Sequence, residues 1–103
     1  MELQVFNMRW GEFVTALKDG TVTKPFLVRE SDPGDPAEWY LYAESPRTLV
    51  QVLTLRGQRR SWRRLDGAFR DMERDIGEMP PITIYPSIEA VNLLPLSSPE
   101  SSQ

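Results

Sequence analysis

The apolar residues change their spacing between positions 48 and 76, and this change constrains the fold more than any other feature. The segment Thr48–Leu55 is rich in Leu, Val and Thr, which is typical of a strand buried on both faces. In the segment Leu65–Ile76 the apolar residues recur at helical spacing instead. A buried strand followed by an amphipathic helix needs a sheet with helices packed on it. We therefore expect an α+β domain.

The rest of the chain supplies the other elements of this domain. Helical spacing predicts a first helix from about Met8 to Lys18, with Asn7 as its N-cap and Asp19-Gly20 at its end. Residues 1–7 are expected to form an edge strand or an arm. Apolar and aromatic runs between Pro- and Gly-containing turns predict further strands at 25–29, 39–43, 60–62 and 82–85. We predict a two-layer sandwich: an antiparallel meander of three to four strands with two helices on one face, in the order α-β-β-β-β-α-β.

A chain of 103 residues has the usual size of one domain. We place this domain at residues 1–94, with a short turn from Ser87 to Leu94, and predict a disordered Ser/Pro-rich tail at 95–103. No segment approaches the roughly 18 apolar residues that span a bilayer. The first residues also lack the basic and apolar regions of a signal peptide. We expect a small, acidic, cytoplasmic protein without membrane contact.

The chain contains no Cys and no His. This excludes thiol nucleophiles, thiolate metal sites and catalysis by a histidine base. Carboxylate pairs such as Asp66 with Glu73 fall on predicted helix surfaces among counter-charges. The acidic loop 30–38 does not have the ligand spacing of a calcium-binding EF-hand loop. We therefore expect no enzyme activity, no catalytic residue, no cofactor and no metal.

Positive charge is concentrated in one part of this acidic chain. Residues 47–64 contain six Arg and no acidic residue, whereas the segments on both sides are acidic. The dense part of this band surrounds a predicted turn at Gly57. Arg side chains bind carboxylates and phosphates with two parallel hydrogen bonds. The predicted partner-binding residues of this band are Arg56, Arg59, Arg60, Trp62, Arg63 and Arg64.

Two tyrosines extend this predicted site. On a strand, Tyr40 and Tyr42 point to the side opposite Trp39 and Leu41, so one aromatic pair is expected on a face that the helices leave uncovered. Aromatic residues and Arg commonly anchor interfaces. An exposed aromatic face also makes a homodimer a reasonable expectation. A simpler interpretation is a solvated hairpin whose arginines pair with the acids of the following helix.

Residues 53–72 also carry a resemblance. The run Leu53-Thr54-Leu55-Arg56-Gly57-Gln58-Arg59-Arg60-Ser61-Trp62-Arg63-Arg64-Leu65-Asp66-Gly67-Ala68-Phe69-Arg70-Asp71-Met72 is similar to a strand, an "ARGE-R-x-F" turn and an "LDAA" helix. It resembles small ParC-type accessory proteins of plasmids and integrative elements, which are distinct from the topoisomerase subunit of that name. The strands at 25–28 and 39–41 fit the same layout, so the resemblance spans about residues 25–85. It implies an accessory role in plasmid partition or mobile-element maintenance, with partition or replication proteins as partners, and no catalytic residues.

These observations favour a non-catalytic adaptor or regulatory protein. Its arginine-rich hairpin and sheet aromatics are expected to bind an acidic surface on a protein partner. Two alternatives remain open from the sequence. The first is direct binding of nucleic acid by the same arginines, with Trp62 stacked on a base. The second is a small inhibitor of a host or phage enzyme.

Overall fold

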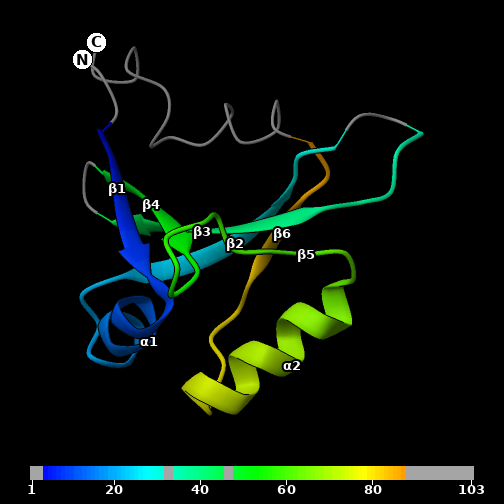
Figure 1. Ribbon diagram of the computed structural model, residues 1–103. Coiled ribbons are helices and arrows are strands. Elements are labelled where there is room, and N and C mark those ends of the chain that lie inside the picture. The colour runs from blue at the N-terminus through cyan, green and yellow to red at the C-terminus, as the bar shows by residue number, and fades with distance from the viewer. Residues whose placement is uncertain (1–3, 32–33, 46–47, 88–103) are drawn as a thin grey trace, which may run out of the picture.

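The computed structural model describes residues 4–31, 34–45 and 48–87. The described elements are short, and the four consecutive strands β2 to β5 separate the two helices (Figure 1). In chain order the elements are β1 (Gln4–Arg9), α1 (Trp10–Lys18), β2 (Thr23–Arg29), β3 (Trp39–Ser45), β4 (Thr48–Leu53), β5 (Ser61–Trp62), α2 (Leu65–Ile76) and β6 (Thr83–Tyr85).

The strands form one sheet in the order β1-β4-β3-β2-β6, with β5 paired to β3. Strands β2, β3 and β4 make an antiparallel meander, and β5 is also antiparallel to β3. At the two outer positions, β1 is parallel to β4 and β6 is parallel to β2. The α+β class is therefore confirmed, but the sheet is mixed and has six strands. The predicted antiparallel meander is present in β2, β3 and β4, and the described sheet is mixed because β1 and β6 add to it in parallel, beside strands that are distant in the sequence.

The start of the chain also differs from the prediction. Met8 lies in β1 and not in a helix, and α1 begins at Trp10. The helix is capped by Glu12, whose Oε1 accepts a hydrogen bond from the Arg9 backbone N–H at 3.1 Å. Asn7, the predicted cap, instead accepts a hydrogen bond from the Gln51 side chain of β4 at 3.1 Å. The ladder with β4 outweighs the local helical pattern because it pairs all six residues of β1.

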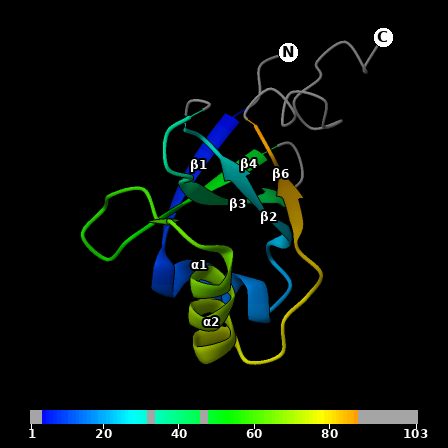
Figure 2. The same ribbon diagram turned by 90° about the vertical axis from the view of Figure 1, so that its right-hand side faces the viewer.

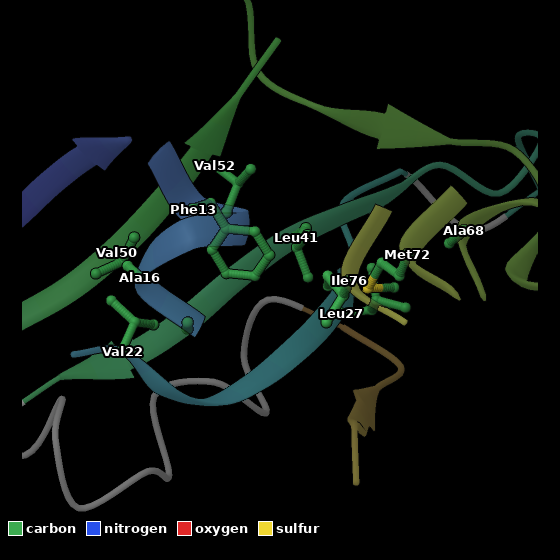
Figure 3. Packing of buried hydrophobic residues seen from close by; sticks show 11 residues of the cluster. Phe13, Ala16, Val22, Leu27, Leu41, Val50, Val52, Ala68, Met72 and Ile76 are labelled. Atoms are coloured by element: carbon green, nitrogen blue, oxygen red, sulfur yellow. The ribbon is translucent and has the colours of Figure 1, made fainter. Parts of the chain in front are cut away.

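Helix α2 has the predicted bounds, and both helices lie on the same side of the sheet (Figures 1 and 2). Gly20 and Gly77 follow the two helices with φ of 84° and 91°, a conformation that favours glycine. The apolar stripes of the helices meet the sheet in the main core (Figure 3). Its buried members are Phe13, Ala16, Val22, Leu27, Leu41, Ala43, Val50, Val52, Ala68, Met72 and Ile76.

The opposite face of the sheet has a second apolar layer. Phe26, Val28 and Tyr42 are buried there, and Tyr40, Leu49 and Tyr85 pack against them. The Phe26 ring stacks on Tyr42 with centroids 5.6 Å apart and meets Tyr85 edge-on at 5.4 Å. The predicted alternation is confirmed, since Trp39 and Leu41 belong to the helix-side core while Tyr40 and Tyr42 belong to this layer.

Two predictions concern residues outside the described ranges, namely the turn from Ser87 to Leu94, of which only Ser87 is described, and the tail at 95–103. Among the described residues, no helix has the length and apolar character needed to cross a membrane.

Candidate partner-binding site

The arginine-rich segment forms a hairpin turn after β4, in which an isolated bridge joins Leu53 to Arg59. The next strand, β5, pairs with β3 and not with β4, which differs from the hairpin that the sequence predicted. Thr54 and Gln58 close the turn through a backbone hydrogen bond of 2.6 Å, and the Gly57 N–H donates to the Thr54 carbonyl at 2.9 Å. Gly57 has a φ of 88°, which the turn requires and which a side chain would strain. Figure 2 shows this turn projecting away from the sheet and the helices. The hairpin therefore presents its tip to the surroundings.

Arg59 is directed onto the second face of the sheet and is held there. Its Nη2 lies 2.6 Å from Glu30 Oε2 and 2.5 Å from the Tyr42 hydroxyl. The guanidinium lies over the Tyr40 ring, 4.0 Å from the centroid. Tyr42 completes the network by donating its hydroxyl hydrogen to Glu30 at 2.6 Å. Arg59 therefore contacts Glu30 and both tyrosines, although 39% of its side chain remains exposed.

The surroundings of Tyr42 keep it a hydrogen-bond donor. Burial of the ring, together with the neighbouring Glu30 carboxylate, raises the pKa of the Tyr42 hydroxyl well above its ordinary value. Only 7% of Tyr42 is exposed, so its ring is not accessible to a large partner. The sequence correctly indicated the face on which Tyr42 lies, but not that this face is largely covered.

Arg60 and Trp62 face the helices and form a structural bracket with Trp10 and Asp71. The Arg60 guanidinium lies between two indoles, 5.0 Å from the Trp10 ring and 4.7 Å from the Trp62 ring. It pairs with Asp71 Oδ2 at 2.8 Å, and Trp62 Nε1 donates to the same oxygen at 2.9 Å. These contacts join the hairpin to α1 and α2. Because Trp62 is engaged in this way, it is not available to stack on a nucleic-acid base.

Asp75 extends the bracket on α2 and gives it a pH dependence. Hydrogen bonds from Arg74 and from Trp10 Nε1, the latter at 2.6 Å, lower the pKa of the Asp75 carboxyl to about 2. A depressed carboxyl pKa stabilises the fold above the unfolded-state value of about 3.9, and this contribution is lost as the pH falls toward 2. In urea unfolding, the wild type should lose more stability than Asp75→Asn between about pH 5 and pH 2.5. Equal losses would contradict the role assigned to this carboxylate.

Arg56, Arg63 and Arg64, the other described arginines of the band, are exposed. Arg64 pairs with Asp66 at 3.1 Å, and because both side chains are largely exposed this ion pair contributes little to stability. Arg56 is exposed and makes no ion pair with a described residue. Arg63 borders a groove of about 370 Å³ whose lining includes Glu30, Asp35 and Glu38. The acids around Arg63 weaken its attraction for an anionic partner.

The structure adds Arg9 to the site. Its Nη1 donates to the Leu55 carbonyl at the hairpin turn at 2.6 Å, although 46 positions separate the two residues. Leu55 itself is 70% exposed, which is the largest exposed fraction among the large apolar residues described. We call the surface formed by Arg9, Leu55, Arg56 and Gln58 the turn tip. No local signal in the sequence indicates Arg9, because the parallel pairing of β1 with β4 alone brings it to the hairpin.

Within the described ranges, no cluster of three or more acidic side chains is arranged to hold a metal ion. The turn tip contains no acid, no base that could abstract a proton near neutral pH and no nucleophile. The turn tip combines two arginines with an exposed apolar residue. No family model matches this sequence, and no curated protein or solved structure matches it either.

Proposed function

We propose that this protein is a non-catalytic adaptor or regulator that binds an acidic protein surface through the turn tip. The observation that carries the proposal is Leu55, whose side chain is 70% exposed and whose backbone carbonyl accepts a hydrogen bond from Arg9, with Arg56 next to it in the chain. An exposed apolar residue of this kind commonly marks an interaction site when polar groups surround it. The two arginines supply attraction to carboxylates and fix the orientation of the partner.

The turn tip suits a protein better than a nucleic acid. A phosphate backbone can pair with the arginines, but it offers no apolar pocket for the Leu55 side chain. Trp62, the aromatic residue expected to stack on a base, is held against Arg60 and Asp71. The chain is also acidic overall, which opposes approach to DNA or RNA. An acidic protein segment with one apolar side chain matches both parts of the tip.

The same proposal covers the biological setting. The resemblance of residues 53–72 to ParC-type accessory proteins supports a role in plasmid or mobile-element maintenance, with a partition or replication protein as the partner. Such a role requires recognition of another protein and no chemistry. The proposed turn tip lies within that segment, apart from Arg9 on β1.

A peptide-display selection tests the proposed recognition. Random peptides should be selected on the wild-type protein and counter-selected on Arg9→Ala/Arg56→Ala. We expect enrichment of peptides that combine Asp or Glu with one large apolar residue. The selected peptides should bind the double variant at least about tenfold more weakly, because two charge contacts are lost. Leu55→Ala should weaken binding in the same assay by removing the apolar contact.

The matched control is Lys18→Ala/Arg70→Ala, which removes two exposed positive charges outside the turn tip. This variant should bind the peptides as the wild type does. Selected peptides without acidic residues, or equal loss of affinity in both double variants, would refute the proposal. Titration with duplex and single-stranded DNA at about 50 and 200 mM salt tests the alternative of nucleic-acid binding, since the affinity for phosphates falls steeply with salt. Tight DNA binding that depends on Arg9 and Arg56 would favour the nucleic-acid function.

A further inference from the structure

Strand β1 is an edge strand of the sheet that the described residues form. Its six residues pair with β4 in a continuous register, and no described residue pairs with its outer side. The backbone N–H and C=O groups of such an edge can accept another strand. Figure 1 shows β1 at the margin of the molecule, away from the strands at the other end of the sheet.

The two edges of the sheet are protected to different extents. At the opposite edge, β6 has only three residues, with Pro81 shortly before it and Pro86 directly after it. Short length and flanking prolines are devices that prevent an edge from pairing with another strand. Strand β1 has twice the length, contains no Pro or Lys and shows no irregularity in its register. Its residues Val5 to Met8 are uncharged.

The side chains of β1 make its edge apolar on both faces. Phe6 is aligned with Val50 on the helix side of the sheet, and it is 54% exposed. Val5 is aligned with Leu49 on the second face, and it is 56% exposed. Exposed apolar residues above and below an open strand edge are expected to be covered by a partner.

We propose that this partner is a second copy of the chain, which adds its own β1 antiparallel to the first. Residues opposite each other in an antiparallel pair point to the same face, so a twofold axis at Phe6 places Phe6 against Phe6. In the same register Val5 faces Asn7 of the second copy. This arrangement covers the exposed Phe6 side chain with its own counterpart and creates a closed dimer.

Charge favours this occupant. Arg9 is the charged residue of β1, and the antiparallel register keeps the two Arg9 residues about 20 Å apart along the strands. The centre of the proposed β1–β1 interface is uncharged, so it does not favour an acidic or a basic strand from another protein. The dimer extends one sheet across two copies and places a turn tip at each end of this interface. The inference does not depend on the proposed function, but it would give an acidic partner two binding sites.

Light scattering over about 1 μM to 1 mM protein tests the dimer, because a small interface is expected to dissociate within this range. The apparent mass should rise from the 11.9 kDa of one chain toward twice that value. Phe6→Lys should raise the dissociation constant at least about tenfold, since charge at an edge opposes pairing. Thr83→Lys, on the protected edge, should dimerise as the wild type does. Circular dichroism should show both variants folded, because both altered side chains are exposed.

Cross-linking tests the register, and the absence of Cys from the chain makes the result unambiguous. Phe6→Cys should form a disulfide-linked dimer under mild oxidation, because opposite residues of an antiparallel pair are close enough for this bond. Thr83→Cys should remain largely unlinked. A mass of one chain at all concentrations would overturn the proposal. Dimerisation unaffected by Phe6→Lys, or equal cross-linking of both Cys variants, would place the interface elsewhere and overturn it as well.

Discussion

Replacing Phe13 by alanine is expected to lower the free energy of unfolding by about 3–5 kcal/mol, the usual cost of removing a buried aromatic side chain. Phe13 is 0% exposed and lies in the centre of the main core (Figure 3). Its ring also contacts Trp10 with centroids 5.9 Å apart. The substitution leaves a cavity where α1 meets the sheet and loosens the helix that carries Trp10. A loss of this size is a large part of the roughly 5–15 kcal/mol that stabilises a typical domain.

Urea unfolding followed by circular dichroism measures this loss, and Phe69→Ala provides the matched control. Phe69 lies on α2 and is 38% exposed, so less of its ring is removed from water. Its replacement should cost about 1 kcal/mol or less. Similar midpoints for the two variants would show that Phe13 is not at the centre of the core.

Replacing Asp71 by alanine is expected to lower the free energy of unfolding by about 2–4 kcal/mol, because it leaves several donors without their acceptor. Asp71 accepts hydrogen bonds from Arg60, Trp62 and Arg74. Arg60 and Asp71 are mostly buried, with 26% and 22% of their side chains exposed. Without the carboxylate, the Arg60 guanidinium remains between two indoles with no counter-ion. The hairpin then loses its main connection to α2.

Asp66→Ala tests whether partial burial of the ion pair explains the large effect expected for Asp71→Ala. Asp66 pairs with Arg64 on the same helix end, but both side chains are largely exposed. Its loss should cost less than about 1 kcal/mol. Trp fluorescence should change in Asp71→Ala, because the environment of Trp62 changes, and should remain unchanged in Asp66→Ala. Equal destabilisation by the two substitutions would contradict the bracket.

The bracket and the turn tip have separate roles, and the variants can distinguish them. Arg60 and Arg56 are four positions apart in one hairpin, yet one is held by α2 and the other reaches solvent. Arg56→Ala should therefore reduce partner binding with little change in stability. Arg60→Ala should destabilise the fold, and its effect on binding should follow from that loss. A reading of the arginine band as one uniform binding surface predicts equal effects instead.

Much of the candidate site could not be predicted because the contacts of several arginines are made with residues that are distant in the sequence. Arg59 is held by Glu30, which lies 29 positions away. Arg60 is held by Asp71 on the following helix, and that pairing agrees with the interpretation of a hairpin neutralised by helix acids. Arg9 reaches the turn from β1, where the local pattern predicted a helix. The positive band was evident in the sequence. The sequence did not indicate which of its arginines would form ion pairs: Arg59 and Arg60 pair with Glu30 and Asp71, while Arg56 has no such pair among the described residues.

The local sequence pattern was enough to predict helix α2 and the two faces of strand β3. The stripe from Leu65 to Ile76 determined α2 because its spacing continues over three turns and ends at Gly77. The alternation from Trp39 to Tyr42 determined which aromatic residue lies on which face. Tertiary structure decided the parallel pairing of β1 and β6, since each joins segments that only the folded chain brings together. Tertiary structure also decided which arginines form ion pairs, because it brings Glu30 to Arg59 and Asp71 to Arg60.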